Sequence, residues 1–173
     1  MEIKRLDREA YAGKKFSLHY ITKGYMHIER TSLGFELSYK RFDQPEERFF
    51  EDCFFNEWLE APLAFGAFEN GQLLGYVEGS LEKWNNRYRI SNICVFDSAR
   101  RHSGIGTALM DTILKEAKGS GARMVVLETQ TCNENAIAFY RKNGFDIIGF
   151  DLFAYSNSDL ERHEIRIEMG KRI

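Results

Sequence analysis

The stretch from residue 88 to residue 129 constrains the fold most, because a strand, a helix and a second strand follow one another there. YRISNICVF (88–96) alternates as a strand does, a helix is predicted over about 104–118, and MVVLET (124–129) is a nearly continuous apolar run. Such a run is typical of a strand that is covered on both faces. Two strands joined through one helix run parallel. The chain is therefore predicted to be an α/β protein with a central parallel strand pair.

The flanking segments predict antiparallel strands. Residues 63–96 contain three strand-like runs, separated by Asn70-Gly71 and by the looser turn Asn85-Asn86. Asn-Gly is a strong signal for a tight hairpin turn. A short helix is predicted at 133–145, and two further strands at about 145–153 and 162–169. The sheet should therefore be mixed, mostly antiparallel and flanked by helices.

The N-terminal third predicts two strands and a helix. Residues 16–30 and 33–42 alternate apolar and polar side chains, as strands do. Residues 46–60 follow Pro45, a residue that favours the first turn of a helix. Apolar residues then recur at helical spacing opposite an acidic face. In the helix predicted at 104–118, the buried stripe should consist of Ile105, Ala108, Leu109, Thr112, Ile113 and Ala117.

Size and composition favour a single globular domain spanning residues 1–173. The net charge of −2 gives no general attraction to nucleic acid. No apolar run approaches the roughly 18 residues of a membrane helix. The first residues lack the apolar core of a signal peptide, and the three cysteines have no metal-ligand spacing. We therefore expect a cytoplasmic protein with reduced thiols and no metal.

The segment ARRHSGIGTALM (99–110) combines glycines and cations at the start of a helix. Main-chain N–H groups at a helix start have no partners within the helix and carry partial positive charge. Glycine lets an oxygen approach the main chain closely. With Arg100, Arg101 and Ser103 added, the segment predicts a phosphate or pyrophosphate site. The alternative is an ordinary flexible helix cap. The pattern matches neither a P-loop nor, for lack of a third glycine, the dinucleotide fingerprint.

A second motif extends this interpretation. The sequence Arg101-x-x-Gly104-x-Gly106 is followed, after a strand, by an N-x-x-A-x-x-F-Y-x-x-x-G-F pattern formed by Asn133, Ala136, Phe139, Tyr140, Gly144 and Phe145. Both motifs, in this order, resemble the GNAT superfamily of N-acetyltransferases, and the resemblance covers about residues 63–150. Within the superfamily, LETQTCNENAIAFYRKNGFDIIGFD (127–151) is similar to the streptothricin acetyltransferases.

The resemblance implies transfer of an acetyl group from acetyl-CoA to a primary amine of a small cationic substrate. Streptothricin is the expected acceptor, which would make the protein an antibiotic-resistance enzyme. In the GNAT fold the central parallel pair splays around acetyl-CoA. The residues expected to bind acetyl-CoA are Ile93, Cys94, Val95, Arg100, Arg101, His102, Ser103, Gly104, Ile105, Gly106, Thr107, Asn133, Ala136, Phe139 and Tyr140.

The chemistry requires a base and an acid. An alkyl ammonium has a pKa of about 10.4, so a carboxylate or a water held by one must take its proton. Glu78 and Glu82, on one strand, are joint candidates for this base. The resemblance assigns protonation of the leaving thiolate to Tyr140. The alternatives are structural: Tyr140 as a packed aromatic, Asn133 as a helix cap, and the strand carboxylates as partners in salt bridges.

Acidic and aromatic side chains are expected around a cationic acceptor. Glu128, Trp84 and Asp151 are the substrate-binding candidates. Further candidates are Glu51, Asp52, Glu57, Glu60 and Asp159. For the four on the helix predicted at 46–60, the alternative is an ordinary solvated face. Two other functions stay open: an acetyltransferase acting on protein or peptide amines, and a non-catalytic acyl-CoA sensor. The protein is expected to be a monomer or a homodimer.

Overall fold

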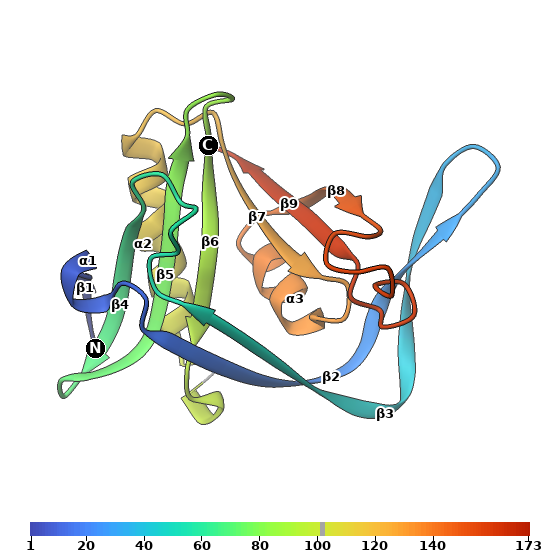
Figure 1. Cartoon of the computed structure of the whole chain (residues 1–173), viewed down its shortest axis with the longest axis horizontal. Helices are drawn as coiled ribbons and strands as arrows, with labels where there is room; N and C mark the ends of the chain where they lie inside the picture. The colour runs from blue at the N-terminus through green and yellow to red at the C-terminus, as the bar shows by residue number, and fades with distance from the viewer. Residues whose placement is uncertain (101–102) are drawn as a thin grey trace. The chain divides into compact units, whose positions relative to one another are not determined.

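The computed structural model describes residues 1–100 and 103–173, which form two compact units (Figure 1). Unit 1 consists of Met1–His19, Phe49–Leu127 and Lys171–Ile173. Unit 2 consists of Tyr20–Arg48 and Glu128–Gly170. In the part of the chain so described, no helix has the length and apolar character needed to cross a membrane.

Unit 1 contains the predicted antiparallel meander. Its sheet has the order β1-β4-β5-β6-β7, and neighbouring strands are antiparallel up to β6. Asn70 and Gly71 both have left-handed φ angles, 51° and 80°, as the tight turn between β4 and β5 requires. The strands are β1 (Glu2–Arg5), β4 (Leu63–Glu69), β5 (Gln72–Glu82), β6 (Arg87–Val95) and β7 (Met124–Gln130).

The parallel pair and its crossover helix are confirmed. β6 and β7 pair in parallel from Arg87↔Met124 to Ile90↔Leu127. Helix α2 (Ile105–Gly119) connects them and contacts β4, β5 and β6, so it covers one face of these strands (Figure 1). The buried side chains of α2 are Ile105, Leu109, Met110, Ile113 and Ala117. Ala108 and Thr112, predicted in this stripe, are only half-buried, and Met110 takes part instead.

Aromatic side chains form a second core in unit 1. Phe54 lies at its centre, with ring centroids 5.1 Å from Phe16 and 4.5 Å from Tyr76. Tyr11, from the short helix α1 (Arg8–Tyr11), also contacts Phe54, at 5.6 Å. Other members of this cluster are Leu6, Phe55, Ala64 and Cys94. Neither β1 nor α1 was predicted from the sequence.

Unit 2 is built from the distal part of a long hairpin and the C-terminal elements. The hairpin consists of β2 (Lys15–Arg30) and β3 (Phe35–Cys53), joined by a turn in which Thr31 N donates to Gly34 O. Helix α3 (Glu134–Lys142) begins at the predicted cap, Asn133. The two predicted C-terminal strands are confirmed with shifted ends, as β8 (Asp146–Asp151) and β9 (Arg166–Arg172).

The helix predicted at 46–60 is wrong, because β3 continues as a strand to Cys53. Cross-strand aromatic contacts replace the helical periodicity: Phe49 stacks on His19 at 5.0 Å, and Phe50 lies 6.4 Å from Phe16. Contacts of this kind commonly decide strand formation. Pro45 is tolerated because each strand of a two-stranded ribbon has an open edge that needs no N–H.

Candidate active site

A β-bulge in β6 determines which side chains share a face of unit 1. Across β5 and β6, Glu78 lies opposite Asn92, while the next residue, Gly79, lies opposite Ile90, so Ser91 is an extra residue. Residues directly opposite each other share a face, and adjacent residues of a strand do not. Ile90 and Asn92 therefore face opposite sides of the sheet, and Asn92 faces the same side as Glu78.

Glu78 is a fully buried carboxylate in the middle of β5. Its side chain is 0% exposed. Oε2 accepts a hydrogen bond from the Tyr76 hydroxyl, whereas Oε1 has no hydrogen-bond partner among the described residues. Burial raises the pKa of Glu78 to about 7, opposed by the Tyr76 hydrogen bond and reinforced by the charge of Asp52. Near neutral pH, this carboxylate can therefore accept or release a proton.

Asp52 is fixed beside this carboxylate by three donors. Its Oδ1 accepts from Cys53 N and Asn56 Nδ2, both at 2.8 Å, and its Oδ2 accepts from Asn92 Nδ2 at 2.8 Å. The sequence analysis named Asp52 as a possible contributor to acceptor binding, on the acidic face of the helix predicted at 46–60, and not as a neighbour of Glu78. Asn92 was not predicted at all, since its orientation depends on the bulge.

Glu82 is a different kind of carboxylate. It forms ion pairs with Arg87 at 3.2 Å and with Arg89 at 2.5 Å. Burial alone would raise the pKa of Glu82, but the hydrogen bond and charge of Arg89 outweigh burial and hold that pKa below its ordinary value. Glu82 also lies opposite Arg87, the first residue of β6. Val95, the last residue of β6 and a predicted acetyl-CoA contact, is about 26 Å from Arg87 along the strand.

Trp84 lies in the turn beside Glu82 and is 83% exposed. Its ring is 5.9 Å from the guanidinium carbon of Arg87. The structure thus brings Glu82 and Trp84 together at the β5–β6 turn, whereas Glu78 lies in mid-strand beside Asn92.

Helix α2 begins with main-chain groups that no described side chain caps. Its N-cap, Gly104, has a left-handed φ of 88°, and a Cβ built there would meet nothing within 4 Å. Ser103 Oγ donates to Arg100 O at 2.6 Å. Arg100 forms an ion pair with Glu69, so a neighbouring carboxylate already offsets part of its charge.

The other predicted residues of this turn differ in exposure. Ile105 is buried in the core, Gly106 is half-buried and Thr107 is exposed. Arg101 and His102, also predicted to bind the pyrophosphate, lie outside the described residues.

The end of β6 offers main-chain groups beyond the last parallel pair. Its pairing with β7 ends at Ile90↔Leu127, but β6 continues to Val95. Phe96 N donates to Leu74 O on β5. Because main-chain groups alternate in direction along a strand, the N–H and C=O groups of Ile93 and Val95 point to the side of β6 away from β5. The corresponding groups of Cys94 face β5, and its side chain lies in the aromatic core.

In unit 2, α3 carries the second motif. Asn133 Oδ1 accepts from Ala136 N at 3.2 Å, which confirms the helix cap. Tyr140 is 8% exposed, and its ring lies 5.7 Å from Phe139 and 6.3 Å from Phe145. This environment agrees with the packing alternative for the ring, and the acid role of the Tyr140 hydroxyl stays a prediction.

The predicted substrate carboxylates of unit 2 converge on one arginine. Arg166 lies 3.7 Å from Glu128 and 3.4 Å from Asp151. The side chains of Glu128 and Asp151 are 40% and 48% exposed, so both are accessible to a solute. A cation on a substrate would thus compete with Arg166 for two carboxylates.

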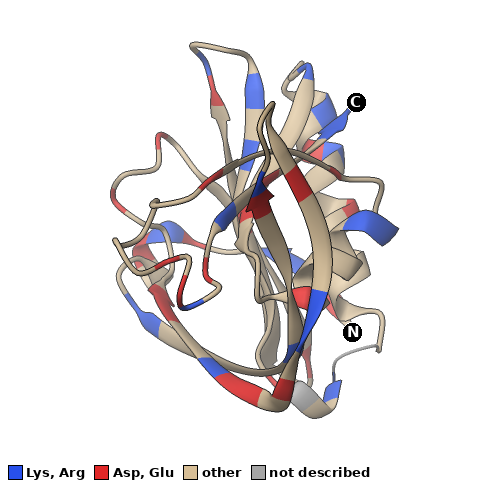
Figure 2. Ribbon diagram, turned by 90° about the vertical axis from the view of Figure 1, so that its right-hand side faces the viewer, with Lys and Arg blue, Asp and Glu red and all other residues tan. Residues whose placement is uncertain are grey.

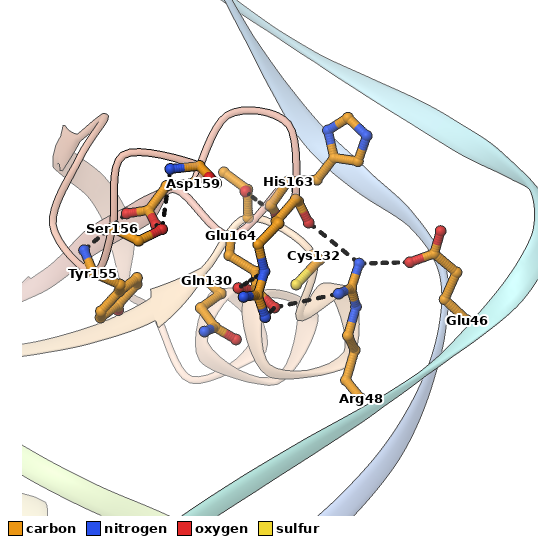
Figure 3. Close-up of polar contacts among 12 residues, drawn as sticks. Glu46, Arg48, Gln130, Cys132, Tyr155, Ser156, Asp159, His163 and Glu164 are labelled. Carbon is orange, nitrogen blue, oxygen red and sulfur yellow. Dashed lines mark hydrogen bonds and ion pairs between the residues drawn. The ribbon is translucent and has the colours of Figure 1, made fainter.

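Asp159, another candidate for acceptor binding, is buried and hydrogen-bonded to its own loop, which is typical of a structural role. It is fully buried and accepts from Tyr155 N at 2.8 Å and Ser156 Oγ at 2.6 Å (Figure 3). Burial would raise the pKa of Asp159, but these hydrogen bonds lower it overall. Close to it in sequence, Glu164 accepts from Arg48, which also binds Glu46 (Figure 3).

The remaining acidic candidates are exposed in unit 1. Glu51 and Glu57 lie at the surface, and Glu60 forms an ion pair with Lys83 at 2.5 Å. Acidic and basic residues are also interspersed along the long hairpin (Figure 2). Within residues 1–100 and 103–173, no group of three His, Cys, Asp or Glu side chains is arranged to hold a metal ion.

Comparisons with known proteins identify the family of this chain. A streptothricin acetyltransferase of Escherichia coli is 30% identical over 137 residues, which cover 79% of this chain and 76% of the relative. One from Streptomyces lavendulae is 29% identical over 172 residues, covering 94% and 89%. The crystal structure of a nourseothricin acetyltransferase superposes with a TM-score of 0.78 at 27% identity, covering 99% of this chain and 97% of that one. Residues 28–145 match the model of the acetyltransferase (GNAT) family, and the chain belongs to this family.

Proposed function

We propose that this protein transfers the acetyl group of acetyl-CoA to a primary amine of a streptothricin-class antibiotic. One observation carries the chemical part of the proposal: Glu78 is buried, has a pKa near 7 and keeps Oε1 unpartnered among the described residues. The relatives named as streptothricin acetyltransferases, which match most of this chain, support the choice of acceptor.

The start of α2 fits the diphosphate of coenzyme A. The uncapped amides and the open space at Gly104 leave room for phosphate oxygens close to the main chain. Ser103 and Thr107 would add hydroxyl groups, and Arg100, Arg101 and His102 would add positive charge. The main-chain groups of Ile93 and Val95, beyond the last β6–β7 pair, would pair with the amide-containing pantetheine arm, much as an added strand would. Asn133, Ala136 and Phe139 on α3 are proposed to make further contacts with the cofactor.

Acetyl-CoA, when bound, supplies an acetyl thioester that an amine can attack. Glu78 would take the proton of the amine at Oε1, directly or through one water, because a base with a pKa near neutrality is suited to this step. A main-chain N–H at the end of β6 can donate to the acetyl oxygen as charge develops there. The Tyr140 hydroxyl is proposed to protonate the departing thiolate. Glu82 remains the second candidate base, and its two ion pairs weigh against it.

Acidic side chains are proposed to attract the cationic acceptor. Glu128 and Asp151 both lie close to Arg166, and their partly exposed carboxylates can attract a cationic group. Trp84 offers an exposed ring face on which a cation can rest.

We further propose that residues 1–173 work as a single N-acetyltransferase domain in the cytoplasm, as a monomer or homodimer. The family match supports this because it includes residues of both units. None of the three described cysteines forms a disulfide, which agrees with a reducing compartment.

Steady-state acetylation of streptothricin, of a panel of lysine peptides and of polyamines tests the proposal. We expect streptothricin to have the highest kcat/KM. Faster acetylation of peptides would assign the enzyme to protein or peptide amines. Tight binding of acetyl-CoA without turnover of any amine would indicate an acyl-CoA sensor.

A further inference from the structure

Tyr76 holds Glu78 in one orientation. Its side chain is 0% exposed, and its ring lies 4.5 Å from Phe54 and 5.7 Å from Phe16, in both cases edge to face. Tyr76 and Glu78 are two residues apart on β5, so they share a face of the sheet. The Tyr76 hydroxyl donates its only proton to Glu78 Oε2, which leaves Oε1 as the oxygen available to another partner.

Asp52 acts on the same carboxylate from a different strand. Donors from Cys53, Asn56 and Asn92 fix its two oxygens, and Asn92 is the residue directly opposite Glu78. These three hydrogen bonds hold both oxygens of the Asp52 carboxylate in place. A fixed negative charge is therefore held near Glu78, although Asp52 itself does not bond to it.

We propose that Tyr76 and Asp52 are positioning residues with opposite effects on Glu78: Tyr76 orients the carboxylate and favours its charged form, and Asp52 favours its protonated form. This inference rests on the proposed function, in which Glu78 receives the proton of the amine. It assigns to both residues a role beyond packing, because their balance sets the pH at which the base becomes available.

The other titratable groups around Glu78 are weaker candidates for this role. Cys53 and Tyr88 interact with Glu78, but burial raises the pKa of each, so both stay neutral at neutral pH. Cys94 lies opposite Tyr76 on β6. Lys15 and Glu57 act on Cys53 with opposite charges. Asp52 is the charged side chain that acts on Glu78 itself.

The pH dependence of kcat/KM in two variants tests the proposal. Tyr76→Phe removes a hydrogen bond to the carboxylate, so the pKa of Glu78 should rise and the acid limb should move to higher pH, by about one unit. Asp52→Asn removes the negative charge, so the acid limb should move to lower pH. Opposite shifts are not expected from a general loss of packing, which would lower activity at every pH.

Tyr88→Phe is the matched control. Tyr88 is 2% exposed, and its hydroxyl donates to Gly79 O at 3.2 Å rather than to a carboxylate. This variant also loses one buried hydrogen bond, but it should leave the acid limb where it is. An equal shift in Tyr88→Phe and Tyr76→Phe, or shifts of the same sign in Tyr76→Phe and Asp52→Asn, would overturn the proposal.

Titration of the Glu78 side chain by carbon-13 NMR gives a readout independent of turnover. Glu78→Gln identifies the resonance, and each variant should move its midpoint in the direction given above. If the wild-type protein acetylated no amine, the proposed function would fail while this titration still tested the positioning. If the wild-type enzyme were active but the Glu78 midpoint did not move in either variant, the positioning alone would be refuted.

Discussion

Arg89 Nε lies 2.5 Å from Glu82 Oε1, and Arg87 donates to the other oxygen of the same carboxylate. Glu82 is therefore engaged at both oxygens, whereas Glu78, four residues earlier on β5, keeps one buried oxygen without a described partner. The two carboxylates looked equivalent in the sequence. In the structure, one is the centre of an ion-pair cluster and the other has the properties of a base.

Glu78→Gln should therefore lower kcat by about 10²-fold or more at neutral pH, because the amide cannot accept the proton. Acetyl-CoA affinity, measured by calorimetry, should stay within a few-fold of the wild-type value. Glu82→Gln is the comparison: it should lower stability through the loss of its ion pairs while largely preserving kcat. Equal losses of kcat in the two variants would remove the distinction between them.

Gly104→Glu should abolish measurable binding of acetyl-CoA. The side chain would occupy the open space at the helix start, bring negative charge to the diphosphate and require a φ of 88° that glutamate rarely adopts. Gly121→Glu provides a control after the other end of α2, where φ is 73° and the space is also open. We expect comparable destabilisation but normal affinity in this control. Unchanged affinity in Gly104→Glu, measured by calorimetry, would show that the diphosphate binds elsewhere.

Tyr140→Phe should lower kcat about tenfold or more while acetyl-CoA affinity changes little, because the ring contacts with Phe139 and Phe145 are retained. Pre-steady-state kinetics would establish that acetyl transfer limits the rate. If the chemical rate is the same as in the wild type at every pH, Tyr140 has only a packing role.

Glu78 should also make stability depend on pH. Its pKa is about 7 in the folded protein and near 4.5 when unfolded, so the folded state binds the proton more tightly. The stability that this proton confers is complete below about pH 4 and is lost as pH rises through 7. Glu78→Gln should therefore be more stable than the wild type at pH 8, by about 3 kcal/mol, and this difference should shrink toward pH 4. Urea unfolding at both pH values measures it, and a constant difference would contradict the assignment.

Local signals in the sequence were sufficient for much of the fold. The Asn70-Gly71 turn, the cap at Asn133 and the stripe on α2 each depend on neighbouring residues. The turn and the cap are confirmed, and so are four of the six residues predicted in the stripe. The helix predicted at 46–60 is wrong because Phe49 and Phe50 form their contacts with residues of β2, which are far away in the sequence. A helical spacing of apolar residues cannot reveal a partner at that separation.

The residues of the candidate site also differ in whether neighbouring or distant residues determine their placement. Glu78 could be named as a candidate base only jointly with Glu82, because both carboxylates lie on the same face of one predicted strand. Tyr76 two residues earlier was an available signal, since side chains two apart in a strand share a face. Asp52 and Asn92 could not be placed, because one depends on the course of β3 and the other on an extra residue at position 91.

The bulge at Ser91 divides β6 between two separate tasks. Tyr88 and Ile90, before it, belong to the side of the sheet that α2 covers, and Asn92 and Cys94, after it, belong to the aromatic and acidic side. Substitutions of Tyr88 or Ile90 should thus change mainly the melting temperature, whereas a substitution of Asn92 should also change turnover through its hydrogen bond to Asp52. Because of this single inserted residue, the two halves of β6 can change in sequence independently of each other. The acceptor preference of the enzyme could therefore change during evolution while the packing of β6 against α2 is retained.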